Sequence, residues 1–473
     1  MAYNLLFFSI DSKKAKFNEK EAYELLDSYL PFLSDNVDND VIESIILSLP
    51  SKVHLFEAKL EDEGEIDYIG RVLEIKVKES AVLVKLQNNL KAIIYPSGSI
   101  KRYDIVKTLQ DSDLLYMHLV IRRGRKINGT NIVVKEFFPL IKKEADLSYI
   151  LAYKNDNNKT NWELFLEAIG LQPKKELLAI YLPRFISIFK VPIGANMNYY
   201  NHVLQLTLPA TGKTTFYVNL KFVSNVEIFT TFPSRARLVM DARAGRFGSV
   251  FLRDIIVIDA FDKNLDRQKF EDFFQHVETG LSNAIWSIEK SSSKESHEQK
   301  RHVGFVFLGN LEGKLDLGRL VGENIKNMRK YLQNIMEMRG IPKSSINAFV
   351  DRLAIVDIND TSIDVYKYST GYMMKGPFLA TFLRYLQRCA NEASIDTSKI
   401  TLDKRYSIYA IRIAKILKAL DIEPAEELAV KLVSGEWNWQ EIIQSSESNV
   451  KKEEVTMNEA KEENLYSIDE FEF

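Results

Sequence analysis

The chain has 473 residues, 46% of them hydrophobic and 27% charged, with a formal net charge of −2, which are the proportions of a globular protein of about three domains. Its one cysteine, Cys389, excludes an intrachain disulfide framework, a four-cysteine zinc site and an iron–sulfur cluster. No apolar run approaches the roughly 18 residues of a membrane span and the N-terminus lacks a signal peptide's basic region, so we expect a cytoplasmic protein without a membrane partner.

The first 145 residues divide into two predicted parts. In residues 1–50, apolar side chains recur at spacings of three and four over 15–49, which predicts a helical segment. Residues 51–145 contain short β-branched runs separated by turns, which predicts five or six strands. So many short strands in so short a segment favour a small barrel, and an OB-like barrel is the form we expect.

One predicted turn of this β-rich part is strongly basic. The connection between the runs at 116–121 and 131–138 carries four cations, namely Arg122, Arg123, Arg125 and Lys126. Such a hairpin tip can contact the phosphates of nucleic acid, so residues 51–145 form a candidate DNA-binding domain. A solvated hairpin is the alternative.

The rest of the chain changes pattern three times. Residues 146–200 have a helical pattern and are predicted to form a linker, whereas strands and helices alternate over 201–374, which predicts an α/β layer with a parallel sheet. Residues 375–443 are again helical. Residues 444–473 are polar and acidic and are predicted to be disordered.

Charge is distributed unevenly between the body and the tail. The last 28 residues carry nine acidic and three basic side chains, a net charge of −6, which leaves +4 on the remainder. A mildly basic body permits nucleic-acid binding. The acidic tail, which ends in aromatic residues, is a candidate docking segment for a protein partner, with a solubilising role as the alternative.

A short apolar run at 203–206 precedes a phosphate-loop motif. Gly212 lets backbone N–H groups approach phosphate oxygens, Lys213 reaches the β- and γ-phosphates, and the Thr214 hydroxyl ligates Mg²⁺. Thr207 stands where the usual pattern has its first glycine. An ordinary turn is the alternative, but the strand–loop–helix context favours ATP binding with Mg²⁺. The residues expected around the nucleotide are Pro209, Ala210, Thr211, Gly212, Lys213, Thr214 and Thr215.

Two later apolar runs end in polar residues. Residues 255–258 lead to Asp259, the pattern of a Walker B strand whose carboxylate holds Mg²⁺. Residues 303–309 lead to Asn310. Buried core strands with polar ends are the alternative, but their order after the phosphate loop favours the functional interpretation.

This order of motifs resembles an AAA+ ATPase of the MCM-like group, and most of all the Lon-like ATPases of bacteriophage-exclusion (BREX) systems. The finer resemblance lies in residues 236–259, 277–282 and 305–310, within a similar region of about 195–430. No stretch is assignable to a protease domain. The resemblance implies an AAA+ P-loop core, a C-terminal helical lid over 375–443, and self-association into a ring, expected as a hexamer.

The resemblance also assigns catalytic roles. Asn310 corresponds to sensor 1, which orients the attacking water. Arg352 corresponds to the arginine finger, which reaches the neighbouring subunit's nucleotide. Arg405, or alternatively Arg412, corresponds to the sensor 2 arginine of the lid. For each arginine, an ordinary position on a helix is the alternative.

The chain departs from the AAA+ pattern after Asp259. AAA+ enzymes usually have a glutamate there that polarises the water, whereas this chain has Ala260, and Asp262 is the nearest carboxylate that can substitute. Two interpretations follow. One is a helicase-like ATP hydrolase that couples ATP to DNA translocation, unwinding or remodelling. The other is a nucleotide-gated DNA-binding scaffold with weak hydrolysis.

Residues 286–302 are a second candidate DNA contact. MCM-like motors have a hairpin here that enters the ring channel, and the cations that would grip DNA are Lys290, Lys294, Lys300 and Arg301. A flexible surface loop is the alternative, since the segment is rich in serine. A remodeller that threads polypeptide is a third possible function.

Overall fold

The computed structural model describes residues 5–9, 29–31, 63–86, 89–96, 102–111, 114–123, 126, 129–142, 145–192, 198–220, 225–241, 246–289, 296–311, 327–359 and 363–437. Several sequence predictions lie outside these residues. They are the acidic tail, most of the predicted N-terminal helical segment, and three of the basic residues, Arg125, Lys290 and Lys294.

A parallel sheet forms the centre of the molecule. Its five described strands are β12 (Val226–Phe229), β15 (Ile255–Ile258), β18 (Gly304–Asn310), β11 (Val203–Thr207) and β19 (Ile355–Asn359), in that spatial order. Every neighbouring pair is parallel. All residues of β11, β15 and β19 are buried, as expected for strands covered on both faces. The predicted α/β layer with a parallel sheet is confirmed.

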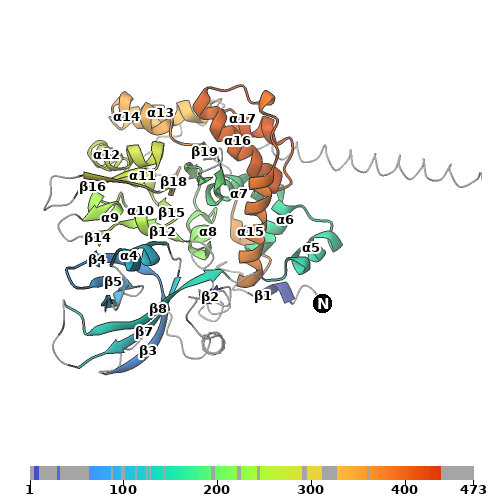
Figure 1. Ribbon diagram of the computed structural model, residues 1–473. Coiled ribbons are helices and arrows are strands. Elements are labelled where there is room, and N and C mark those ends of the chain that lie inside the picture. The colour runs from blue at the N-terminus through green and yellow to red at the C-terminus, as the bar shows by residue number, and fades with distance from the viewer. Residues whose placement is uncertain are drawn as a thin grey trace, which may run out of the picture.

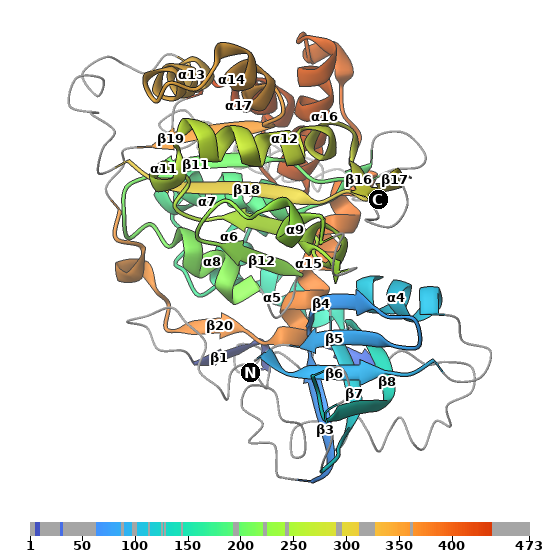
Figure 2. The same cartoon turned by 90° about the vertical axis from the view of Figure 1, so that its left-hand side faces the viewer.

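Helices cover both faces of this sheet (Figure 1). One face carries α9 (Arg235–Leu238), α11 (Phe261–Asn264) and α12 (Arg267–Asn283), which lie in front of the strands in Figure 2, while α10 (Ser249–Leu252) packs against α9 and the lower sheet's β4 (Val72–Val77). The other face carries α7 (Lys175–Ile188) and α8 (Lys213–Leu220). Asp266 caps α12 by accepting the N–H groups of Gln268 and Lys269, so this long helix has a defined start.

Helices also flank the core at both ends of its sequence. Before it, α5 (Leu147–Asp156) and α6 (Asn161–Ala168) occupy the segment predicted to be helical, followed by the short pair β9 (Val191–Pro192) and β10 (Asn198–Tyr199). After β18 come α13 (Met328–Met338) and α14 (Lys343–Val350), and after β19 come η3 (Val365–Tyr368), α15 (Gly376–Glu392), η4 (Thr397–Lys399), α16 (Lys404–Ala419) and α17 (Ala425–Ser434). The C-terminal segment is therefore helical as predicted, and its action as a lid stays a prediction. No described helix is long and apolar enough to cross a membrane.

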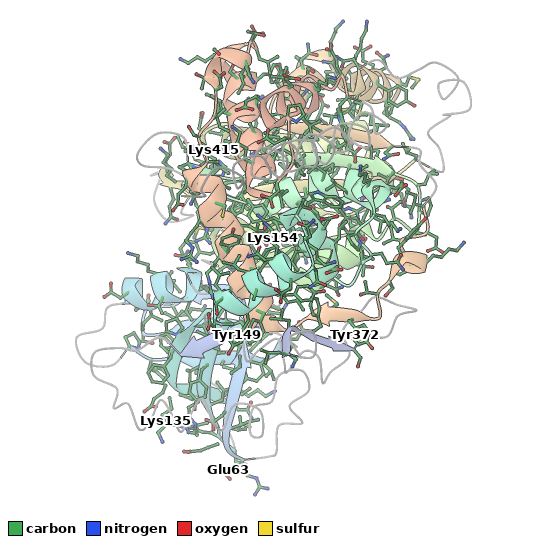
Figure 3. All side chains as sticks on the ribbon, turned by 90° about the vertical axis from the view of Figure 1, so that its right-hand side faces the viewer. Glu63, Lys135, Tyr149, Lys154, Tyr372 and Lys415 are labelled. Carbon is green, nitrogen blue, oxygen red and sulfur yellow. The ribbon has the colours of Figure 1, made fainter. Side chains whose placement is uncertain are left out.

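The β-rich part forms a second sheet below the core in Figure 1. Its strands are β3 (Gly64–Gly70), β4 (Val72–Val77), β5 (Val82–Leu86), β6 (Lys91–Ile94), β7 (Leu114–Ile121) and β8 (Ile132–Lys142), and α4 (Arg102–Asp111) packs against it. The described pairings run β4-β5-β6-β8-β7-β3 without closing, so the OB-like barrel stays a prediction. Figure 3 shows Glu63 and Lys135 on this sheet, far from Lys415 of α16.

A short hairpin joins the two sheets. β13 (Met240–Asp241) pairs with β14 (Arg246–Phe247), and β14 pairs with β4 of the lower sheet. The buried Arg253, just before β15, donates from Nη2 to the carbonyl oxygen of Val72 in β4 at 2.9 Å. The segment between β12 and β15 therefore belongs to both halves of the molecule, which the sequence did not predict.

Two short strands lie within the N-terminal part that was predicted to be helical. β1 (Phe7–Ser9) pairs with β20 (Tyr372–Met374), and β2 (Tyr29–Pro31) pairs with β8. The helix predicted across residues 29–31 is therefore wrong at these residues. Pro31 cannot continue a helix interior, and pairing with β8 gives the other two residues backbone hydrogen-bond partners.

Candidate functional site

The phosphate-loop motif connects β11 to α8 in an open turn. Ala210 has φ = 61° and Gly212 has φ = 69°, so the loop reverses through two left-handed positions. A Cβ on Gly212 would meet the hydroxyl of Tyr181 at 2.7 Å, so only glycine fits there. Pro209 and Ala210 are exposed, and Lys213, Thr214 and Thr215 begin α8. A turn with left-handed positions that leads directly into a helix N-terminus suits an anion.

Lys213 is folded into this loop and is 8% exposed. Its ammonium donates to the carbonyl oxygens of Thr207 (3.1 Å) and Leu208 (3.0 Å), to the Thr207 hydroxyl (2.8 Å), and to Oδ1 of Asn310 (3.1 Å). Burial, followed by the nearby Arg184 charge, lowers the pKa of Lys213 to about 8. Thr207, at the usual position of a glycine, therefore helps to hold the lysine.

We expect ATP affinity to weaken as the pH rises above about 8. The free site has a Lys213 pKa of about 8, and bound phosphates would raise that pKa, so binding above pH 8 takes up a proton. Between pH 7 and 7.5, ionisation of Lys213 should change the dissociation constant little. Above pH 8 the dissociation constant should increase by up to about tenfold per pH unit. Titration calorimetry in buffers of different ionisation enthalpy measures the proton uptake. Lys213→Arg should give a flat profile, and a flat wild-type profile to pH 9.5 would contradict the assignment.

Thr214 and Asp259 meet beside the loop. The Thr214 hydroxyl donates to Oδ2 of Asp259 at 2.9 Å, and the N–H of Ala260 donates to Oδ1 at 2.9 Å. A hydroxyl and a carboxylate in contact supply the hard oxygen ligands that Mg²⁺ uses together with substrate phosphates. These two residues therefore fit the predicted Mg²⁺ site.

Asn310 and Asp262 also come together. Asn310 ends β18 in register with Thr207 of β11, because these strands are parallel neighbours. The backbone N–H of Asn310 donates to Oδ1 of Asp262 at 3.0 Å, while Oδ2 of Asp262 makes no hydrogen bond within the described part of the chain. Ala260 has φ = 57°, and this left-handed turn starts α11 and directs Asp262 back toward β18. Asp262 is thus close enough to Lys213 for its charge to raise the lysine pKa.

The predicted arginine finger lies at the opposite edge of the sheet. Arg352 precedes the amino end of β19, whereas the loop follows the carboxyl end of β11, and these strands are in register over five residues. That separation is about 16 Å at roughly 3.3 Å per strand residue. Arg352 pairs with Glu278 of α12 (2.8 Å) and donates to Ser282 Oγ (2.5 Å) and the carbonyl oxygen of Ala348. It does not reach the phosphate loop of its own chain.

Neither sensor 2 candidate lies at that loop. Arg405 is exposed at the start of α16, near enough to Arg352 for its charge to lower the Arg352 pKa, for which burial is the larger cause. Arg412 is 3% exposed, donates to the carbonyl oxygen of Tyr200 (3.2 Å), and stacks on the rings of Tyr199 and Tyr409. Arg412 is therefore held inside the molecule, and Arg405 faces outward.

The basic segments are only partly described. Arg122, Arg123 and Lys126 are exposed at the connection of β7 and β8. The serine-rich segment has β16 (Ile285–Glu289) and β17 (Ser296–Lys300) as an antiparallel pair, so its described ends form a hairpin. Lys300 is exposed there. Arg301 lies at the hairpin base, 3.9 Å from Asp254.

Sequence reasoning missed a small cavity of about 20 Å³ beside the loop. It is mostly apolar, and Gly212 and Thr215 form its wall on the loop side. The hydroxyl groups of Tyr366 and Thr215 lie 3.2 Å apart there. The other lining residues are Ile169, Leu171, Tyr181, Phe216, Asn219, Leu220, Val365, Met373 and Leu379. They come from segments far apart in sequence, so no local pattern signals the cavity.

Arg184 of α7 was also missed. It is 1% exposed and donates from Nη1 to the carbonyl oxygen of Thr211 in the phosphate loop at 2.8 Å. The sequence around a single arginine in an apolar helix does not indicate which residues the arginine contacts. Its position beneath the loop appears only in the folded structure.

The chain is similar to known proteins over most of its length. Residues 132–420 match the family model described as "Lon-like protease BrxL-like, ATPase domain". The uncharacterized protein ORF425 of Acidianus filamentous virus 2 is 29% identical over 82% of this chain and 86% of its own length. The uncharacterized protein 440 of Sulfolobus islandicus rod-shaped virus 1 is 24% identical over 78% of this chain and 80% of its own length.

Proposed function

Since the chain belongs to this family of BrxL-like ATPase domains, we propose that it is a ring-forming AAA+ ATPase that binds DNA and couples ATP hydrolysis to DNA translocation, unwinding or remodelling. One observation carries the ATPase part of this proposal. The phosphate loop, Asp259 and Asn310 follow or end three strands of one parallel sheet and lie at a single edge. Their side chains are already linked through Thr214 and Lys213.

Each residue of this edge has a role in the proposed reaction. Lys213 and the loop N–H groups bind the β- and γ-phosphates, and Thr214 with Asp259 holds Mg²⁺, which neutralises phosphate charge. Asn310 orients the attacking water. Asp262, fixed by the Asn310 N–H, replaces the glutamate absent at Ala260.

The cavity beside the loop lies where a nucleotide base would adjoin bound phosphates. Apolar walls with a few polar groups are typical of small-molecule sites, but a cavity of about 20 Å³ holds only about one water molecule, so a base would enter only after lining side chains move. Because Gly212 and Thr215 form one wall, a base in this cavity would leave its phosphates over the loop. We therefore propose that adenine binds on this side of the loop, beside Gly212 and Thr215, with the lining side chains displaced.

The arginine positions support a ring. Arg352 and Arg405 lie close to each other at the edge of the sheet opposite the phosphate loop. A head-to-tail interface would bring this edge of one subunit to the loop of the next, and such heterologous interfaces form a ring where the rotation between subunits closes. Arg352 would then stabilise charge on the neighbour's phosphoryl group.

One basic surface supports the DNA part of the proposal. Arg122, Arg123 and Lys126 project from the lower sheet, whereas on the described part of the β16–β17 hairpin the exposed Lys300 lies beside the exposed Glu298. The test is the rate of ATP hydrolysis with no DNA, single-stranded DNA and duplex DNA. Stimulation by either form is expected, and a rate indifferent to both would contradict coupling.

Neutralising the β7–β8 connection should flatten the salt dependence of duplex binding. Substituting Arg122, Arg123, Arg125 and Lys126 with glutamine removes up to four phosphate contacts, and each contact contributes about 0.9 to the log–log slope. Fluorescence anisotropy across a salt series measures the slope. Neutralising the exposed Lys343 and Lys399 instead should keep the wild-type slope, and an unchanged slope in the fourfold variant would place DNA elsewhere.

Ala260 favours a second candidate function. A chain without the usual glutamate could be a nucleotide-gated DNA-binding scaffold that hydrolyses ATP only slowly. Turnover at saturating DNA separates the two functions. A scaffold would bind DNA differently with ATP and with ADP while its turnover stays near the uncatalysed level.

A further inference from the structure

Arg184 is a buried cation that the proposed reaction does not use. Its Nη1 donates to the carbonyl oxygen of Thr211, Nε donates to Oε1 of Gln205 at 2.8 Å, and its guanidinium lies 4.3 Å from the ring centroid of Tyr181. A fully buried arginine is costly unless it is paired and hydrogen-bonded. Its partners therefore indicate what it holds in place.

The network continues from Arg184 to a buried carboxylate. Gln205 donates from Nε2 to Oδ2 of Asp357 at 2.7 Å and to the carbonyl oxygen of Ile180 at 3.0 Å. Both ends of the Gln205 amide are thus used, which fixes its orientation. Asp357 of β19 is 0% exposed. Burial raises the pKa of its carboxyl group to about 7, and the Gln205 hydrogen bond and the Arg184 charge oppose that rise. Strands β11 and β19 and helix α7 anchor the guanidinium from below.

The contact with Thr211 fixes one peptide plane of the loop. In a planar trans peptide the carbonyl of residue 211 and the N–H of residue 212 point in opposite directions. Because Arg184 draws the Thr211 carbonyl oxygen into the protein, the N–H of Gly212 is directed away from it. Gly212, with its left-handed φ, is the residue directly before Lys213.

The same network reaches Lys213. The hydroxyl groups of Thr211 and Thr207 lie 2.9 Å apart, and the Thr207 hydroxyl accepts from the Lys213 ammonium at 2.8 Å. Nη2 of Arg184 also donates to the Thr211 hydroxyl at 3.4 Å. A displacement of Arg184 would therefore disturb both the loop backbone and the lysine.

We propose that Arg184 is a positioning residue for the phosphate loop, which together with Gln205 and Asp357 holds the Thr211–Gly212 peptide in its anion-binding orientation before nucleotide binds. This inference rests on the proposed function for the identity of the anion, the triphosphate of ATP. Preorganisation removes an ordering cost from binding, so its loss should weaken ATP affinity.

The test compares Arg184→Lys with Arg329→Lys. Lysine keeps the positive charge but cannot donate to Gln205 and Thr211 in the fixed geometry of a guanidinium. Arg329 is a matched control, because it is 6% exposed and donates to carbonyl oxygens such as those of Val350 and Leu353, away from the loop. The two readouts are the ATP dissociation constant of the folded fraction and, without nucleotide, amide hydrogen exchange of residues 208–214.

Arg184→Lys should weaken ATP binding at least about tenfold and speed exchange in the loop, whereas Arg329→Lys should change neither beyond its effect on global stability. Unchanged affinity and exchange in Arg184→Lys, or equal changes in both variants, would overturn the inference. If Arg184→Lys does not fold, Gln205→Met replaces it in the test. This variant removes the link to Asp357 with little change of shape, and its ATP affinity and loop exchange are judged in the same way. If wild type binds no ATP, the proposed function fails, and loop exchange still decides the role of Arg184.

Discussion

Replacing Arg352 with alanine should lower the kcat for ATP hydrolysis by about 10³-fold or more, the usual effect of removing an arginine finger. The reason is geometric. Arg352 is about 16 Å from its own phosphate loop, as judged from the five residues of paired strand between them, so a catalytic role would require the phosphoryl group of a neighbouring subunit. ATP affinity should change little, because the guanidinium stabilises charge that develops in the transition state.

Mixing variants tests whether Arg352 acts between subunits. Arg352→Ala and Lys213→Ala should each be inactive, and a mixture should recover part of the activity at interfaces that join an intact loop to an intact arginine. Glu278→Ala is the control, because it breaks the same 2.8 Å ion pair but keeps the guanidinium. If the mixtures stay inactive although both variants assemble, Arg352 is structural. An equal loss of kcat in Glu278→Ala would show the same.

Substituting Asp262 with asparagine should reduce kcat by about 10² to 10⁴-fold, the usual contribution of a positioned general base. Its Oδ1 is fixed by the Asn310 N–H, and Oδ2 has no hydrogen bond within the described residues, which leaves it available to a water molecule. Asparagine keeps the shape and an acceptor but cannot take a proton. The ATP dissociation constant should therefore stay close to the wild-type value.

The variant Ala260→Glu tests whether Asp262 takes the place of the glutamate that usually follows the Walker B aspartate. If Asp262 activates the water, a new glutamate should add little to the wild-type rate. If Asp262 does not, wild type should turn over slowly and Ala260→Glu should accelerate it without tightening ATP binding. Alanine and glutamate both occupy the left-handed position at φ = 57° with a Cβ, so the substitution adds no new backbone strain. A fast wild-type rate that survives Asp262→Asn would contradict both versions.

Three of the central strands, β11, β15 and β18, were predictable because each is a short apolar run that ends in or leads to a polar residue. Ile255–Ile258 is buried on both faces, so it is a continuous apolar run, and the parallel order places Asp259 and Asn310 at the edge where β11 meets the phosphate loop. The position of Asp262 was not predictable. It depends on Ala260 adopting a left-handed conformation, which alanine rarely does and which no sequence pattern announces.

Contacts between residues far apart in the sequence account for the other features that the sequence did not predict. Arg352 matched a motif, but its pairing with Glu278 joins residues 74 positions apart. Arg184, Gln205 and Asp357 each look like an isolated polar residue within an apolar run, and only the stacking of α7 on β11 and β19 makes them one network. The strand pairing of β14 with β4 similarly links residues that are far apart in the chain.

The most direct test of the account is equilibrium binding of ATP with Mg²⁺ to wild type, Lys213→Ala and Lys263→Ala. Lys213 lies within the loop, whereas Lys263 is exposed on the neighbouring α11 and serves as the control. We predict saturable binding of one ATP per chain for wild type and Lys263→Ala, and binding weaker by about 100-fold for Lys213→Ala, since hydrogen bonds from a charged donor to phosphate are lost. Equal affinity in all three proteins, or no saturable binding by wild type, would contradict the assignment of the Thr207–Thr215 loop as the ATP site.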